Sequence, residues 1–135
     1  MRYLAAFGTS AIVMLALDAV WLTVMGDRLY RPVLGDWMRE SFLLPPAVAF
    51  YVLFLSGVTY LATVPALQQG SWKRAAINGA VFGLVAYATY DLTNQATLTR
   101  WSTTITLVDM TWGTFLATTT ALAGYFGSRW MVRRA

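Results

Sequence analysis

The sequence contains no cysteine, no histidine and a single lysine, Lys73. Without cysteine and histidine the chain has no disulfide, thiol nucleophile, Cys/His zinc site, His-ligated haem or Ser-His-Asp triad. A retinal Schiff base needs a lysine inside a membrane span. Lys73 follows a polar turn, so a rhodopsin-like pigment is excluded as well. The glycines form no phosphate-binding loop, and the sequence therefore carries no nucleotide signature.

Charge is also scarce, since charged residues make up 12% of the chain and hydrophobic residues 58%. A soluble domain has roughly 25% charged residues, so the composition predicts a protein embedded in the lipid bilayer. A length of 135 residues allows about four spans of roughly 20 residues each. We therefore expect one domain, residues 1–135, an all-α membrane protein folded as an antiparallel four-transmembrane-helix bundle. The net charge of +4 is explained by loops and tail that orient the spans, and we expect no nucleic-acid partner.

Hydropathy and turn residues predict spans at about 3–25, 42–64, 75–98 and 103–126. Residues 27–41 mix apolar and charged side chains, so we expect an outer interfacial loop or a short amphipathic helix there. Span two is expected to open with Pro45 and Pro46 and to close before Pro65, because proline is best tolerated near a helix start. The short turn after Leu98 makes the last two spans antiparallel neighbours.

The positive residues predict how the bundle is oriented. With an even number of spans both termini share a side, and that side holds six positive residues: Arg2, Lys73, Arg74, Arg129, Arg133 and Arg134. The other side holds four: Arg28, Arg31, Arg39 and Arg100. By the positive-inside rule both termini face the cytoplasm of a multi-pass membrane protein.

Three acidic residues, Asp18, Asp91 and Asp109, interrupt the predicted spans. Counting at about 1.5 Å per residue places each of them roughly 10 Å below the same non-cytoplasmic surface. A charged side chain in a span costs roughly 2.5 to 3.5 kcal/mol on insertion scales, so three acids at one depth indicate a shared site. No lysine or arginine lies in the spans at that depth. We therefore expect the acids to titrate together, with at least one protonated at neutral pH.

Other polar and aromatic residues accompany these acids. Tyr87, Asp91 and Asn94 are spaced i, i+4 and i+7 and so share one helix face. The candidates for ligand binding or proton relay are Asp18, Asp91, Asn94, Asp109, Trp21, Trp112, Tyr87, Tyr90 and Tyr51. Oxygen ligands suit hard cations, but a common depth alone does not define a metal site. We assign no metal, no cofactor and no catalytic residue.

Three stretches carry a resemblance to a known family: Leu17 to Leu22, Tyr90 to Leu98 and Val108 to Gly113. Together they resemble DUF2177, a family of small bacterial four-span integral membrane proteins with no assigned function. The resemblance covers nearly the whole chain. It implies the bacterial cytoplasmic (inner) membrane as the location. The residues that coincide with the motif positions of the family are Asp18, Trp21, Asp91, Asn94, Asp109 and Trp112.

Three functions fit these observations. The one we favour is binding or transport of a small polar or lipid-like ligand near the outer leaflet, or proton relay through the acids. The second is an enzyme acting on a lipid, with one aspartate as general base and a protonated neighbour as general acid. The third is a structural or accessory subunit whose acids form a packing network or face a partner, either a homo-oligomer or another membrane protein.

Overall fold

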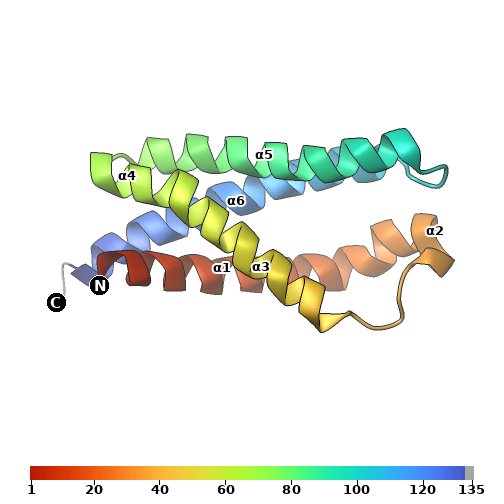
Figure 1. The fold of residues 1–135 in the computed structure, drawn as a ribbon, viewed down its shortest axis with the longest axis horizontal. Helices are drawn as coiled ribbons and strands as arrows, with labels where there is room; N and C mark the ends of the chain where they lie inside the picture. Colours follow the sequence, from red (N-terminus) through yellow and green to blue (C-terminus); the bar gives the residue numbers. More distant parts are fainter. Residues whose placement is uncertain (133–135) are drawn as a thin grey trace.

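The computed structural model describes residues 1–132, and within them all regular structure is helical. Four long helices lie side by side, with both termini at one end and the α5–α6 turn at the other (Figure 1). The all-α bundle expected from the sequence is confirmed. Arg133 and Arg134, which entered the orientation count, lie outside the described residues.

Each of the first two long helices is built from several segments. The first consists of α1 (Arg2–Met25), a π-helical turn (Gly26–Tyr30), α2 (Arg31–Leu34) and a 3-10 turn (Gly35–Trp37). The second consists of α3 (Leu44–Val58), a π-helical turn (Thr59–Thr63) and α4 (Val64–Gln69). The last two are single helices, α5 (Trp72–Thr97) and α6 (Thr103–Val132).

Within the described residues, the first two long helices, Arg2–Trp37 and Leu44–Gln69, are apolar enough to cross a membrane. The other two are also long enough to cross a membrane, with 26 residues in α5 and 30 in α6. They are less apolar, since α5 opens with Lys73 and Arg74 and α6 is rich in threonine. Three of the threonines, Thr111, Thr114 and Thr118, are satisfied inside the helix, because each hydroxyl donates to the carbonyl four residues earlier at 2.7 Å.

The first helix is longer than the sequence indicated. We expected span one to end near Gly26, but Gly26 keeps right-handed helical dihedrals, φ −50° and ψ −54°. The chain passes through the π-helical turn into α2, and the helix ends only at Trp37. Residues 27–41 were expected to form an interfacial loop or a short amphipathic helix. Most of this segment is helical, and the helix continues span one to Trp37. The continuation places the Tyr30 hydroxyl at Asp109.

The second helix also runs past its expected end, because it passes through Pro65 to Gln69. Proline has no N–H, so it leaves the carbonyl of Leu61, four residues earlier, without its usual helical partner. The Asn78 amide of α5 donates to that carbonyl at 3.0 Å. The π-helical turn just before Pro65 accommodates the interruption in the helical hydrogen-bond pattern. The helix stops at Gly70, whose φ of +64° is the left-handed cap conformation.

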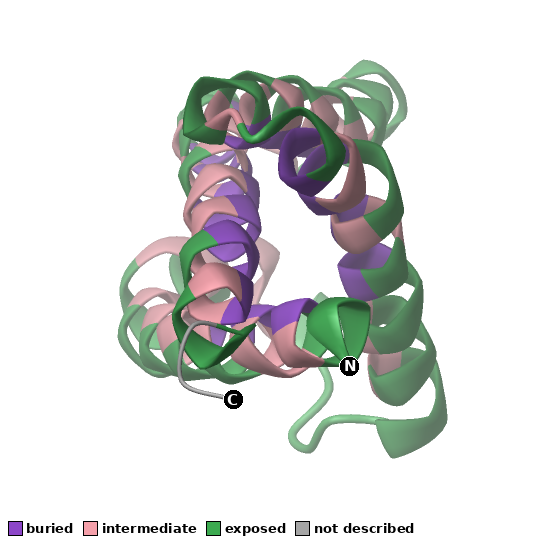
Figure 2. Cartoon of the chain, turned by 90° about the vertical axis from the view of Figure 1, so that its left-hand side faces the viewer, coloured by how far each residue is buried: buried purple, intermediate pink, exposed green. Residues whose placement is uncertain are grey.

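Small residues let α6 lie close to its neighbours. A Cβ on Gly79 of α5 would lie 2.8 Å from the Ala117 carbonyl oxygen of α6, so the two backbones are in direct contact there. Further along α6, Gly124 faces Ser10 of α1, and the Ser10 hydroxyl donates to the Thr120 carbonyl at 2.9 Å. Seen end-on, the buried residues face the inside of the bundle (Figure 2).

Candidate functional site

Asp18 of α1 lies inside the bundle, with 5% of its surface exposed, and joins three of the long helices. Its Oδ2 accepts a hydrogen bond of 2.5 Å from the Tyr51 hydroxyl of α3. Its Oδ1 accepts a longer one, 3.4 Å, from the Trp112 indole N–H of α6. A carboxylate can accept about four hydrogen bonds, so Asp18 keeps acceptor capacity for a further donor.

Asp109 of α6 belongs to a second branch of the same network. It accepts a short hydrogen bond from the Tyr30 hydroxyl, and that hydroxyl in turn accepts from the Trp21 indole N–H at 3.0 Å. The Trp21 ring stacks on Trp112, with ring centroids 4.2 Å apart and planes 8° from parallel. Because Trp112 bonds to Asp18, the indole stack connects the two carboxyl groups.

Asp91 of α5 is fully buried, and it differs from the other two acids in having no donor. Neither of its carboxyl oxygens meets a hydrogen-bond donor in the described residues. Its carboxyl group lies within hydrogen-bonding reach of the Asp109 carboxyl group. Two ionised carboxylates cannot donate to each other, so this contact becomes a hydrogen bond only when the pair holds a proton.

A cavity of about 550 Å³ opens beside the acids, where α3 diverges from α5 (Figure 1). Asp18, Asp109 and the Tyr30 and Tyr51 rings form its polar side. The remaining lining is aromatic or aliphatic: Trp21, Leu22, Phe42, Ala47, Phe50, Phe54, Ala86, Tyr87 and Tyr90. The cavity is therefore an apolar chamber with two carboxyl groups on its wall.

The charge of this chamber is not balanced by the protein. Within residues 1–132 the only ion pair joins Asp27 to Arg31, at 2.9 Å on the exposed surface. None of the three buried acids has a cationic partner there. The described residues also contain no group of three or more acid, histidine or cysteine side chains placed to hold one metal ion. The chamber can therefore offer hydrogen-bond acceptors and negative charge to a ligand.

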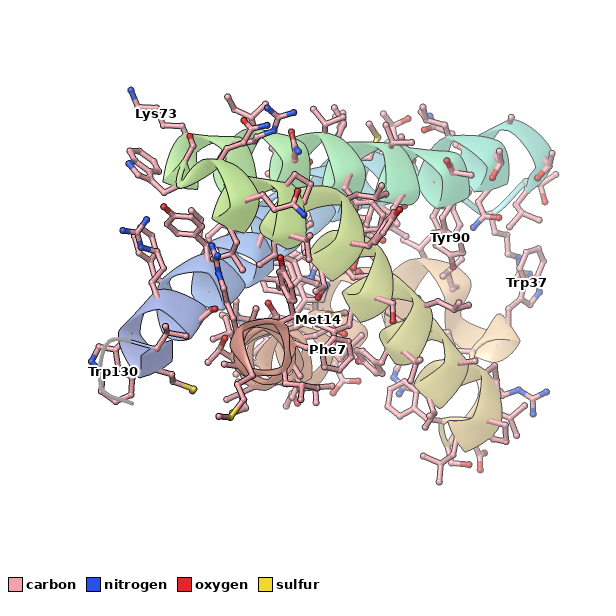
Figure 3. All side chains as sticks on the ribbon, turned by 60° about the vertical axis from the view of Figure 1, so that its left-hand side comes forward. Phe7, Met14, Trp37, Lys73, Tyr90 and Trp130 are labelled. Atoms are coloured by element: carbon pink, nitrogen blue, oxygen red, sulfur yellow. The ribbon has the colours of Figure 1, made fainter. Side chains whose placement is uncertain are left out.

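The structure brings most of the sequence candidates together. Tyr87 lines the cavity, and its ring packs against the Gly113 backbone so closely that no side chain would fit at that glycine. Tyr90 stands at the cavity rim, 57% exposed, and projects from α5 toward the side on which α2 lies (Figure 3). Three candidates, Asp91, Trp112 and Asn94, do not line the cavity. Asp91 and Trp112 still belong to the network, through Asp109 and Asp18 respectively. Asn94 contacts only Tyr90, one turn earlier, among these residues.

Two groups of lining residues were missed from the sequence. Tyr30 lies in the segment that we placed outside span one, and only the unbroken helix through Gly26 brings its hydroxyl to Asp109. The absence of proline between Arg2 and Arg31 was the available signal for that continuity. Phe50 and Phe54 were not among the candidates, but both form cavity wall.

Comparison with known proteins bears on the family rather than on the chemistry. No curated protein and no solved structure matches the chain. A family model described as "Predicted membrane protein (DUF2177)" matches residues 3–126, nearly the whole chain, as the motifs around the three acids indicated. The protein therefore belongs to the DUF2177 family of predicted membrane proteins.

Proposed function

We propose that this protein spans the bacterial cytoplasmic membrane with all four long helices, termini inside, and binds an amphipathic ligand with a cationic head group. The head group lies against Asp18 and Asp109, and the apolar part fills the aromatic chamber. The observation that carries this proposal is the chamber itself, two buried carboxyl groups in an apolar wall without a protein cation beside them.

The size and lining of the chamber fit such a ligand. Ligand sites enclose about 300 to 1,000 Å³, are mostly apolar and carry a few polar groups that fix orientation. The chamber measures about 550 Å³ and has this composition. It lies between α3 and α5, so an acyl or alkyl chain can enter from the bilayer without crossing water.

The electrostatics select a cation. A primary ammonium group has three donors, and both Asp18 and Asp109 keep free acceptor positions beside their protein donors. Aromatic rings on the wall, including Trp21 and Tyr87, add cation–π attraction of about 2 kcal/mol when the cation is desolvated. An anionic head group would face two carboxyl groups and be repelled.

The buried position of Asp91, without a hydrogen-bond donor among the described residues, supports proton exchange as part of the same function. Its buried carboxyl oxygens meet no donor within residues 1–132, and the Asp109 carboxyl group lies beside them, so one proton shared by the two acids would give Asp91 its missing hydrogen bond. A cation arriving at Asp109 supplies positive charge in place of that proton. Ligand binding is then accompanied by release of a proton, which is the arrangement a proton-coupled transporter needs.

The test uses three probes with the same chain, dodecylammonium, dodecanol and dodecanoate, added to the full protein in a neutral detergent. Binding is read from the change in tryptophan fluorescence, to which the stacked Trp21 and Trp112 pair beside the chamber contributes. Dodecylammonium should bind most tightly. Asp18→Asn should weaken it tenfold or more, since a hydrogen bond to a charged group contributes about 1.5 to 3 kcal/mol.

Asp36→Asn is the matched control, because Asp36 is exposed and lies outside the chamber. Ala47→Phe is the second variant, since it fills the chamber and leaves every carboxyl group in place. It should abolish binding while the protein stays folded. Equal affinity for all three probes would overturn the cationic assignment. Undiminished amine binding to Ala47→Phe would overturn the chamber as its site.

A further inference from the structure

The end of the bundle that holds the termini carries only positive charges among its described side chains. The described charged side chains there are Arg2, Lys73, Arg74 and Arg129. No acid lies close to them, because the nearest along α1 and α6 are Asp18 and Asp109. At about 1.5 Å per residue these acids are roughly 24 Å from Arg2 and 30 Å from Arg129. Within residues 1–132, four cations thus share one end of the molecule without a carboxylate among them.

Two of these cations, Arg2 and Arg129, are brought to the same place. They line one hollow of about 210 Å³, together with Ser128 and Val132. Arg2 donates to the Leu67 carbonyl, and the Ser128 hydroxyl donates back to the Arg2 carbonyl at 2.8 Å, which fixes the start of α1 against α6. Neither arginine forms an ion pair within residues 1–132.

Arg129 is held in place by an aromatic ring. Its guanidinium lies 5.3 Å from the centre of the Tyr125 ring and donates to the Tyr125 hydroxyl at 2.6 Å. A guanidinium has five N–H donors, so most of its donors remain for another partner. Two guanidinium groups kept beside one hollow repel each other unless an anion lies between them.

A second hollow of about 550 Å³ adjoins the first and shares Arg129. Its walls include Trp72, Phe126 and Trp130, each about half exposed. Lys73 and Trp130 lie at this same end of the bundle (Figure 3). Aromatic side chains of this kind sit at the level of lipid head groups. Arg129 therefore belongs to the wall of both a cationic hollow and an apolar, aromatic one.

We propose that these two hollows, which share Arg129, bind one anionic phospholipid of the leaflet on the side of the termini. Arg2 and Arg129 hold the phosphate, since the planar guanidinium fork matches phosphate oxygens in pairs. The glycerol and the upper acyl chain lie over Trp72, Phe126 and Trp130. This site is independent of the chamber at the other end of the bundle, and its lipid has the opposite charge preference.

The test measures quenching of tryptophan fluorescence by brominated lipids in the full protein, held in neutral detergent micelles. Brominated phosphatidylglycerol is compared with brominated phosphatidylcholine of the same chains. We expect phosphatidylglycerol to bind about fivefold or more tightly, and Arg129→Gln to remove most of that preference. Arg2→Gln should also lower the preference for phosphatidylglycerol. Agreement between the two variants would show that the loss is not caused by a folding defect in one of them.

Arg39→Gln is the matched control, because it removes one positive charge from an exposed position at the opposite end. It should leave the lipid preference unchanged. If Arg39→Gln acts as strongly as Arg129→Gln, the preference reflects net charge and the site does not exist. If inorganic phosphate at millimolar concentration displaces the lipid fully, the hollow binds phosphate alone and the lipid assignment is overturned.

Discussion

Replacing Asp91 by asparagine tests whether the acid pair holds a shared proton. Asp109 has a donor in Tyr30, whereas Asp91 has none, so the negative charge is better stabilised on Asp109 and the proton resides on Asp91. In Asp91→Asn the side-chain amide can take the place of the protonated carboxyl and donate to Asp109. The shape, the burial and the hydrogen bond are then nearly conserved.

The two protonation states predict different magnitudes. If both carboxyl groups were ionised, their repulsion at about 4 Å would cost about 4 kcal/mol at an effective dielectric constant of 20, with several kcal/mol of desolvation in addition. Asp91→Asn would then stabilise the protein by at least about 4 kcal/mol, or roughly 15 °C in Tm for a chain of this size. With a shared proton the change should stay within about 1 kcal/mol, or roughly 4 °C.

The assay combines thermal unfolding in detergent with infrared spectroscopy of the carboxyl C=O stretch. Wild-type protein should show the band of a protonated carboxyl group. Asp91→Asn should lack that band, while Asp36→Asn, which changes an exposed acid, should retain it. A Tm rise of 10 °C or more in Asp91→Asn, with no protonated band in the wild type, would refute the shared proton.

Two further predictions concern stability and use the same unfolding assay. Gly79→Ala should destabilise the bundle by about 1 to 3 kcal/mol, because its new methyl group meets the rigid Ala117 carbonyl. Gly8→Ala, in an open position on α1, should be neutral or stabilising by up to about 1 kcal/mol, and equal Tm values for the two variants would contradict the close contact. Asn78→Ala should cost about 1 to 3 kcal/mol, because it leaves the Leu61 carbonyl freed by Pro65 without its donor. Asn78→Asp, which has no amide N–H to donate, should cost at least as much, and an unchanged Tm in both variants would show that the carbonyl finds another partner.

The sequence was sufficient for the helical class because apolar segments of this length in so few residues leave little alternative to a bundle. It was also sufficient to place Asp18, Asp91 and Asp109 on inward faces. An acid facing hydrocarbon costs several kcal/mol, whereas an acid facing another helix can find hydroxyl and indole donors. Tyr51 and Trp112 are those donors for Asp18, and both were among the candidates.

The sequence was not sufficient for Tyr30, because its position depends on helix geometry that composition does not report. Gly26 and the charged residues after it are typical of a span end, yet the helix continues through a π-helical turn. Such a turn adds a residue and rotates everything beyond it by about 100° relative to an uninterrupted α-helix. Counting from Trp21 at 3.6 residues per turn therefore puts Tyr30 on the wrong face, and the hydrogen bond from Trp21 could not be foreseen.

The distribution of small and aromatic residues explains why the chamber forms at the end remote from the termini. Gly79 and Gly83 draw α5 onto α6 in one half of the bundle, so no space remains between these two helices there. In the other half α3 presents Phe50, Tyr51 and Phe54 toward its neighbours, and rings of that size hold α3 away from α5. The acids lie in this wider half, where hydroxyl donors reach them and space is left beside them. An acid network that served only to bind the helices together would gain from being tightly enclosed, so the open wall beside Asp18 and Asp109 favours a ligand.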